Sequence, residues 1–246
     1  MNKAIIMGAS SGIGMETAKL LIRDGWTVGL AARREERLIS IRQEMQTELK
    51  QNQFIFIAKI DITQTDAGAK LKQLITEMGG MDLYLHVSGI GKQNRTLESG
   101  IELHTIETNG LGFTRMVGEA YRYFSTIKHG HIACITSIAG TKGLGPAPSY
   151  SATKAMQNVY IQALEQQALS NKIPIKFTDI RPGFVDTDLL SGSFRYPLML
   201  KPQAVARQIV KAIYKGKHVY TIDWKWRIIT AGWRWIPNCV WRSIKL

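Results

Sequence analysis

The chain opens with a short apolar strand, a glycine-rich turn and a helix in direct succession. Residues 3–7 (KAIIM) form the predicted strand, residues 8–14 (GASSGIG) the turn, and residues 15–25 the helical pattern. Backbone N–H groups at the start of a helix attract anions, so this order is typical of a phosphate-binding site. The alternative is an ordinary connection between a strand and a helix. With three glycines in this setting, we favour the nucleotide site.

Each of the three glycines has its own expected purpose. Gly8 permits the turn, Gly12 lets the backbone approach a pyrophosphate, and Gly14 allows the helix to pack closely against the strand. The spacing is G-x-x-x-G-x-G, which differs from the commoner G-x-G-x-x-G arrangement.

Apolar strand patterns alternate with helical patterns along the rest of the chain. The strand patterns are residues 26–31, 54–60, 82–87, 131–136, 174–180 and 218–222. The helical patterns are residues 35–49, a segment ending near 78, residues 102–124 with an interruption at Asn109-Gly110, a segment from 149, and residues 202–214. This alternation predicts an α/β fold with a parallel sheet and helices on both faces. At 246 residues the chain most simply folds as one domain.

The end of the second strand bears on the choice of cofactor. A dinucleotide fold that prefers NAD places a carboxylate here for the ribose 2′-hydroxyl, whereas an arginine suits a 2′-phosphate. This chain has Arg33 and Arg34, with no acid before Glu35. We therefore expect NADP(H), with Arg33 as the principal contact and Ser10 assisting. The alternative is that both arginines are solvated residues at the start of the next helix.

Three polar residues stand at spacings that suit proton transfer to or from a carbonyl or an alcohol. Ser137 follows the strand at 131–136, while Tyr150 and Lys154 lie four residues apart on one face of a predicted helix. A phenol with a pKa of about 10 is a poor base, and lowering that pKa by ~3 units requires ~4 kcal/mol of differential stabilisation, which a nearby ammonium can supply. Taken alone the motif is weak, because Tyr and Lys often share a helix surface without catalytic purpose.

The motifs in their order closely resemble those of the classical short-chain dehydrogenase/reductase family, over residues 1–222. The features that carry the resemblance are GASSGIG at 8–14, Asp61, Asn109 in ETNGLG, the interval of thirteen residues between Ser137 and Tyr150, and RPGFVDT at 181–187. One motif departs from the family: where Asn-Asn-Ala-Gly usually follows the fourth strand, this chain has His86-Val87-Ser88-Gly89. The glycine is kept, and the asparagine thought to brace the sheet is replaced.

The resemblance implies a Rossmann-type doubly wound sheet and a set of site residues. Tyr150 would be the proton donor to a ketone, Lys154 would bind the nicotinamide ribose and lower the tyrosine pKa, Ser137 would polarise the substrate oxygen, and Asn109 would hold a water of the proton relay. The implied cofactor-binding residues are Gly8, Ser10, Ser11, Gly12, Ile13, Gly14, Arg33, Asp61, Ile62, Ser88, Gly89, Tyr150, Lys154, Pro182, Gly183, Val185 and Thr187. We expect no metal site.

In the family a substrate lid follows the loop that contains Pro182 and Gly183, which we call the Pro-Gly loop. The lid corresponds here to residues 188–201 (DLLSGSFRYPLMLK). Its apolar composition favours a hydrophobic, lipid-like or steroid-like substrate. A helix that simply packs on the core would have the same composition, so both interpretations stay open.

Residues 223–246 form a tail after the last strand of the predicted domain. Five of the chain's six tryptophans lie there, interleaved with five basic residues, and residues 201–246 carry a net charge of +9 out of +13 for the whole chain. Tryptophan with lysine or arginine on a short segment is typical of a bilayer interface. A tail that caps the pocket or contacts a partner subunit is the alternative, and nucleic acid is not expected.

Two cysteines without a metal-binding spacing, and no apolar run long enough to span a bilayer, favour a cytoplasmic protein that can lie peripherally on the inner membrane face. We expect an NADPH-dependent carbonyl reductase that forms a homo-oligomer, as the resembled family often does. The alternatives are a non-catalytic NADP-binding sensor and a peripheral membrane protein on the same fold.

Overall fold

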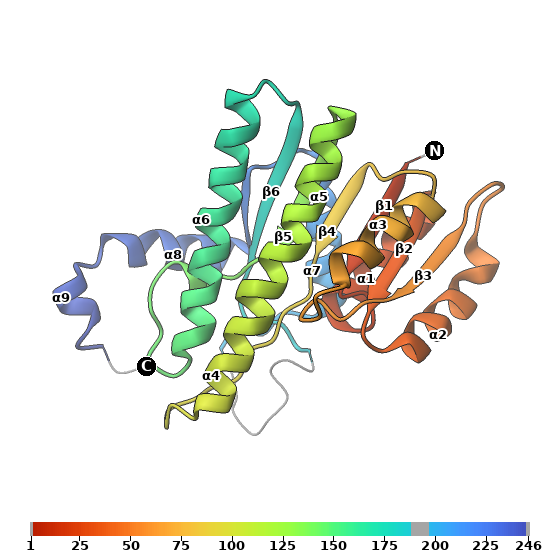
Figure 1. Ribbon diagram of the computed structural model, residues 1–246. Coiled ribbons are helices and arrows are strands. Elements are labelled where there is room, and N and C mark those ends of the chain that lie inside the picture. Colours follow the sequence, from red (N-terminus) through yellow and green to blue (C-terminus); the bar gives the residue numbers. More distant parts are fainter. Residues whose placement is uncertain (1, 188–196, 245–246) are drawn as a thin grey trace.

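The computed structural model describes residues 2–187 and 197–244, which form a twisted parallel sheet between two layers of helices (Figure 1). All pairings between adjacent strands are parallel, and the strand order is β3-β2-β1-β4-β5-β6-β7. The strands are β1 (Lys3–Met7), β2 (Thr27–Ala32), β3 (Ile55–Lys59), β4 (Leu83–His86), β5 (Gly130–Ile135), β6 (Ile175–Pro182) and β7 (Val219–Ile222). The predicted doubly wound sheet is confirmed, and each predicted strand is found within two residues of its expected bounds.

Each face of the sheet has its own apolar core. Helices α1 (Gly12–Arg23), α2 (Glu35–Met45) and α7 (Pro202–Tyr214) cover one face, and α2 continues into the short turn η1 (Gln46–Glu48). Helices α3 (Ala67–Glu77), α5 (Phe113–Ile127) and α6 (Pro148–Ser170) cover the other. All six residues of β2 are buried, as expected of a strand covered on both faces.

The helical pattern around residues 102–124 is not broken at Asn109. Helix α4 (Ser99–Ile106) continues through a wider, π-type segment, η2 (Glu107–Gly112), directly into α5. The fully buried Asn109 side chain accepts from the backbone N–H of Ile90 at 2.9 Å and donates to its carbonyl at 2.7 Å. The interruption expected from the sequence is therefore a local widening of one helix, positioned at a residue of the site.

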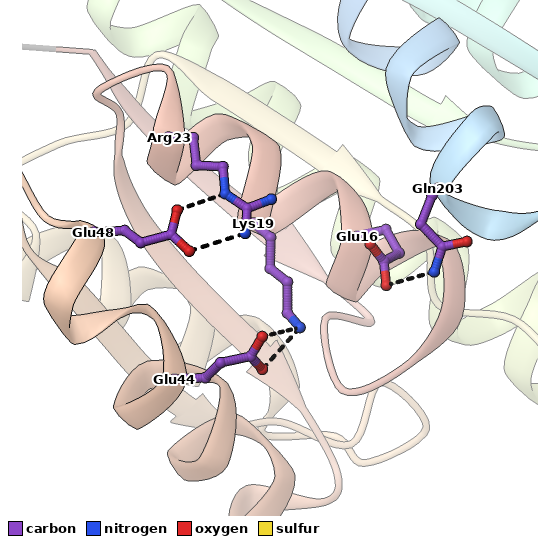
Figure 2. A network of polar contacts seen from close by, with 6 residues as sticks. All are labelled: Glu16, Lys19, Arg23, Glu44, Glu48 and Gln203. Carbon is purple, nitrogen blue, oxygen red and sulfur yellow. Dashed lines mark hydrogen bonds and ion pairs between the residues drawn. The ribbon is translucent and has the colours of Figure 1, made fainter.

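Helix α1 is fixed on two sides by polar contacts (Figure 2). Toward α2, Lys19 bonds both carboxylate oxygens of Glu44 at 2.6 and 2.8 Å. One turn further, Arg23 forms a two-pronged ion pair with Glu48 in η1, at 2.5 and 2.9 Å. Gln203 at the start of α7 donates to Glu16 at 3.1 Å. These exposed pairs each contribute little to stability, and they join α1 to the helices on either side of it.

Two helices follow β7, α8 (Trp224–Trp235) and α9 (Asn238–Trp241), which are drawn to the left of α6 in Figure 1. Asp223 caps α8, because its carboxylate accepts from the N–H groups of Lys225 and Trp226 at 3.0 and 3.4 Å. Across residues 2–187 and 197–244, every helix is too short or too polar to cross a lipid bilayer.

Most of the lid expected at 188–201 lies outside the described residues. The remainder runs beside the Pro-Gly loop, where the N–H of Leu200 donates to the carbonyl of Phe184 and the N–H of Asp186 donates to the carbonyl of Leu200, both at 2.9 Å.

The segment His86-Val87-Ser88-Gly89, which departs from the resembled motif, places an imidazole inside the protein at the end of β4. His86 contacts the Tyr84 hydroxyl at 3.0 Å through Nδ1 and packs edge-on against Phe113. Burial, with a smaller contribution from the charge of Lys154, lowers the pKa of His86 from 6.5 to about 3. Burial also lowers the pKa of His131 to about 4. Both rings are therefore neutral near pH 7.

These buried imidazoles predict an acid-dependent loss of stability. Their folded-state pKa values lie below the unfolded value, so the unfolded chain takes up protons first as the pH falls below 6.5. At pH 5 this should cost roughly 2 kcal/mol for His86 alone. Urea unfolding at pH 7 and pH 5 should show a smaller pH-dependent loss in His86→Asn than in the unsubstituted protein. The exposed His129→Asn is the control, and an equal loss in all three proteins would contradict the prediction.

Candidate active site

The glycine loop after β1 is packed so closely that side chains are excluded. Gly8 has a φ of +100°, and a Cβ there would lie 2.6 Å from the backbone nitrogen of Ser88. A Cβ on Gly14 would lie 2.1 Å from the Gly8 carbonyl oxygen. Gly12, with φ +52°, faces the methyl group of Thr187, 3.0 Å from where its Cβ would stand. The loop thus contacts β4 on one side and the segment after β6 on another.

The first turn of α1 forms a cradle for an anion. Ser11 is the N-cap, and in the described part of the chain its hydroxyl does not bond to an N–H group of that turn. The N–H groups of Gly12, Ile13 and Gly14 stand at the positive end of a 12-residue helix without an acidic residue in its first turn. A dinucleotide diphosphate fits this donor set.

The arginine that reaches the glycine loop is Arg34. Its Nη2 donates to the hydroxyls of Ser10 at 3.2 Å and Ser11 at 2.9 Å. The sequence prediction assigned the main contact to Arg33, which is exposed at the end of β2. The two residues are adjacent, so sequence position alone could not select between them.

Asp61 and Ile62 follow β3, and their side chains make different contacts. The Asp61 carboxylate accepts from the N–H and the hydroxyl of Thr63 at 3.1 and 2.8 Å, which fixes the turn at the sheet edge. Ile62 is buried in the core, and its carbonyl accepts from Arg115 at 2.5 Å. Its side chain therefore packs inward, and its carbonyl is bonded to α5.

Behind the glycine loop, Gly89 brings the β4 turn against two predicted catalytic residues. A Cβ at Gly89 would lie 3.2 Å from Oδ1 of Asn109 and 3.6 Å from Nζ of Lys154. The preceding Ser88 donates its N–H to the Met7 carbonyl at 2.9 Å. The β1 and β4 turns, η2 and α6 thus meet at one point.

The other two catalytic candidates lie at the same edge. Ser137 stands just beyond β5, where its hydroxyl accepts from the N–H of Ala139 at 3.0 Å in the turn η3 (Ile138–Gly140). Tyr150 and Lys154 come from the first two turns of α6, with Lys154 Nζ 5.7 Å from the centroid of the tyrosine ring. Lys154 also donates to the carbonyl of Ile135 at 3.1 Å, which joins α6 to the end of β5.

The pKa values differ from the expectation for the tyrosine. Burial raises the pKa of the Tyr150 phenol above 10, and a hydrogen bond with Ser137 acts in the opposite direction. Burial lowers the pKa of Lys154 from 10.5 to about 8, opposed by Cys134 and Asp179. The direction is opposite to the predicted lowering by Lys154, because burial dominates the pKa of the phenol, and the ammonium donates to the Ile135 carbonyl and to Gln157.

Gln157 is a site residue that the sequence prediction missed. It is fully buried, accepts from Lys154 Nζ at 3.0 Å and donates to the Asn109 carbonyl at 2.8 Å. One amide therefore links Asn109 in η2 with Lys154 in α6. A glutamine one turn after Lys154, on the same helix face, is the sequence signal that could have indicated it.

Gly91 is a second missed residue, because its importance is steric. A Cβ at Gly91 would lie 2.7 Å from a ring carbon of Tyr150. The backbone of the loop after β4 therefore forms one wall of the tyrosine's position.

The predicted loop at 181–187 contacts the glycine loop and helix α8. Pro182 ends β6, and Thr187 lies against Gly12 of the glycine loop. Val185 is buried and pairs with Leu200. Gly183, assigned from the sequence to the cofactor, is required by another neighbour, since a Cβ there would lie 2.1 Å from Nε1 of Trp226 in α8.

Sequence comparisons connect this geometry to known proteins. A family model described as short chain dehydrogenase matches residues 2–195. An uncharacterized oxidoreductase of Myxococcus xanthus is 28% identical over 239 residues, which cover 96% of this chain and 92% of the relative. A second, from Staphylococcus haemolyticus, is 30% identical over 220 residues, covering 88% of this chain and 92% of the relative.

Solved structures of dehydrogenases share this fold. An alcohol dehydrogenase from Thermococcus sibiricus, complexed with 5-hydroxy-NADP, superposes with a TM-score of 0.76 at 25% identity, covering 90% of this chain and 95% of that one. A short-chain type dehydrogenase/reductase from Mycobacterium ulcerans has the same fold, with a TM-score of 0.81 at 19% identity and coverage of 99% and 98%.

The bridge formed by Gln157 predicts how its removal acts. Gln157→Leu leaves Lys154 with one partner, and loss of a buried hydrogen bond to a charged group costs ~1.5–3 kcal/mol, so turnover should fall roughly 10- to 100-fold. Gln157→Glu places a carboxylate beside Lys154, raises the lysine pKa, and should move the alkaline limb of the pH–rate profile upward.

The control is Gln162→Leu, the same change at an exposed position of α6. An unchanged pH–rate profile in both Gln157 variants would show that the bridge has no part in positioning Lys154.

Proposed function

Because this chain belongs to the short-chain dehydrogenase/reductase family, we propose that it is an NADP(H)-dependent reductase that transfers hydride to the ketone of a hydrophobic substrate. The family's oxidoreductases use NAD(H) or NADP(H), which supply the hydride. The remainder of the proposal rests on this chain's own residues.

The observation that carries the proposal is the meeting of four polar side chains beside the glycine loop. Asn109 and Lys154 contact the turn at Gly89, Ser137 lies just beyond β5, and Tyr150 stands one helical turn from Lys154. The carboxyl edge of a parallel sheet is where such folds bind their ligands. A nicotinamide dinucleotide fits here, since the first turn of α1 offers its N–H groups and has no acidic residue.

The protonated form of Tyr150 is the form that reduction requires. Burial raises the pKa of this phenol, so it is protonated near pH 7 and can donate its proton to a developing alkoxide. Ser137 would share the same substrate oxygen through its hydroxyl. Lys154, with a pKa of about 8, is mostly cationic at pH 7 and would bind the nicotinamide ribose, the role that the family implies for it.

In this arrangement Asn109 supports the site from behind. Its side-chain amide is bonded to the backbone N–H and carbonyl of Ile90, and its backbone carbonyl accepts from the Gln157 side chain. It therefore holds the turn after β4 against Lys154. The water-holding role implied by the family remains a proposal for the same residue.

Three observations support NADP(H) as the cofactor. Arg34 is held over the hydroxyls of Ser10 and Ser11, and the first acid after β2 is Glu35, which already belongs to α2. An arginine fork and two hydroxyls suit a 2′-phosphate. The archaeal alcohol dehydrogenase that shares this fold was solved with an NADP derivative.

The substrate class and the assembly are proposals with narrower support. Leu198 and Met199, at the end of the expected lid, are exposed and apolar. Exposed apolar side chains also lie on α4, η2 and α6, at Leu103, Leu111, Val159 and Leu169. The first pair favours a hydrophobic substrate, and the second group favours a homo-oligomer.

The two arginines after β2 can be separated by paired substitutions. Arg34→Ala should weaken NADPH binding at least roughly tenfold while leaving NADH binding nearly unchanged, because only NADPH loses a charge-assisted bond to its phosphate. Arg33→Ala, measured by the same fluorescence titration, is the matched comparison. A larger loss for Arg33→Ala would return the role to the residue favoured from the sequence, and equal losses of both cofactors would reject NADP(H) selection here.

The proton donor is tested by Tyr150→Phe, which keeps the ring against Gly91 and removes only the hydroxyl. Turnover of a ketone identified from a carbonyl panel, followed by NADPH absorbance, should fall by roughly 10²–10⁴-fold. Thermal stability and NADPH affinity should change little. Near-normal turnover in Tyr150→Phe would mean that another group donates the proton.

A further inference from the structure

Helix α8 has an inward face that fixes it to the rest of the protein. Trp226 is buried, packs edge-on against Phe184 and lies over Gly183, and Thr230, one turn later, is buried as well. Trp233 continues this row by contacting both Trp226 and Trp241. Three of the five tail tryptophans therefore serve packing.

The link between helices α8 and α9 is anchored to the loop after η3. Lys142 donates to the Ile236 carbonyl at 3.1 Å and to the Asn238 side chain at 2.9 Å. Trp241 donates its indole N–H to the Gly143 carbonyl at 2.8 Å. The tail thus lies on the loop between Ser137 and Tyr150, with its orientation fixed.

The outward face of α8 is an apolar row. Trp224, Ile228, Ala231 and Trp235 follow at intervals of four, three and four residues, which places them on one side of a helix. Trp224 is 60% exposed, Ile228 63% and Trp235 87%. We call these four residues the outer row. Packing against the described residues does not account for two exposed tryptophans on this helix.

Basic side chains flank the outer row on both sides. Lys225 stands on one side with its ammonium 5.9 Å from the Trp224 ring centroid, and Arg227 and Arg234 stand on the other. Among the residues that the structure describes, none of these three is paired with a carboxylate. Residues 201–246 contain ten Lys/Arg and one acid, Asp223, which is used as the cap of α8.

We propose that the outer row of α8 docks on an anionic lipid bilayer. The indoles and Ile228 would enter the interfacial region while the flanking lysine and arginines contact lipid phosphates. Two-fold pairing of this face with a second copy would bring Arg227 and Arg234 of both subunits together without acids to offset them. A nucleic acid would satisfy the cations but offers no apolar phase for Ile228.

Docking through α8 has a consequence for the site that rests on the proposed function. The same helix touches Gly183 and the loop after Ser137, so the catalytic edge would be held close to the bilayer surface. A ketone dissolved in lipid would then reach Tyr150 by a short route. The binding itself does not depend on any activity and can be measured separately.

The test uses the full-length protein and sedimentation with vesicles of phosphatidylcholine, with or without phosphatidylglycerol. Binding is expected on the anionic vesicles at low salt and should weaken as salt rises. Trp224→Ser combined with Trp235→Ser should reduce the partition coefficient at least about tenfold at every salt concentration, because apolar insertion is not screened. Phe54→Ser, which removes an exposed aromatic ring from another surface, should leave binding unchanged.

The contribution of charge is tested by two double variants that each remove two positive charges. Arg227→Gln with Arg234→Gln should lower binding about tenfold or more at low salt, since each basic residue near an anionic surface contributes ~1 kcal/mol. Arg37→Gln with Arg42→Gln removes the same charge from α2 and should have little effect. Equal losses in both pairs would show that net charge alone attracts the protein and would overturn the proposal.

Two further outcomes would also overturn it. Absence of sedimentation at low salt, with an intact fold by circular dichroism, would exclude bilayer docking. Self-association or nucleic-acid binding that Trp224→Ser with Trp235→Ser abolishes, without vesicle binding, would assign the outer row to that partner instead. Cofactor titration on the same variants separates these results from failure of the proposed reductase activity, because the substituted side chains lie on the outward face of α8, away from its contact with Gly183.

Discussion

The buried ammonium of Lys154 is the interaction on which the catalytic edge of this protein depends. A cation removed from water is costly unless its donors are bonded, and here the Ile135 carbonyl and the Gln157 amide supply those bonds. Each acceptor comes from a different direction, one from the end of β5 and one from the next turn of α6. Meeting both requires that helix and strand stand at a fixed distance.

Close backbone packing supplies that distance. A Cβ at Gly140 in η3 would lie 2.7 Å from the backbone of Lys154, and one at Gly91 would meet the ring of Tyr150. Small residues on the loops around α6 therefore let the helix approach until its lysine reaches the strand. The buried carboxylate of Asp179 pairs with Arg181 and accepts a hydrogen bond from Thr136. Its negative charge favours the charged form of Lys154. The polar residues and the glycines are two parts of one constraint.

The sequence predicted those features that depend on local spacing. Strand, glycine turn and helix at residues 3–25, and a tyrosine and a lysine one turn apart, follow from periodicity and need no knowledge of distant contacts. Selecting Arg34 over Arg33 requires the direction of a side chain at the first turn of α2. The role of Gln157 depends on η2 and β5, which are distant in sequence, and a buried glutamine has no pattern of its own. The rise in the tyrosine pKa was not predicted, because the spacing shows that Lys154 is near the ring but not that burial raises the pKa of the phenol.

The seat of Trp226 on Gly183 also has a consequence for the order in which the protein is made. The diphosphate cradle lies between β1 and α1, and the pairing of β1 with β2 that supports it joins segments close together in sequence. The indole that covers Gly183 comes from α8, and β7, whose Ile222 carbonyl bonds Gly183, comes just before it. Because synthesis runs from the N-terminal side, the strands around the glycine loop are made long before the residues that cover Gly183. A nascent chain can therefore pair β1 with β2 before this part of the site is covered.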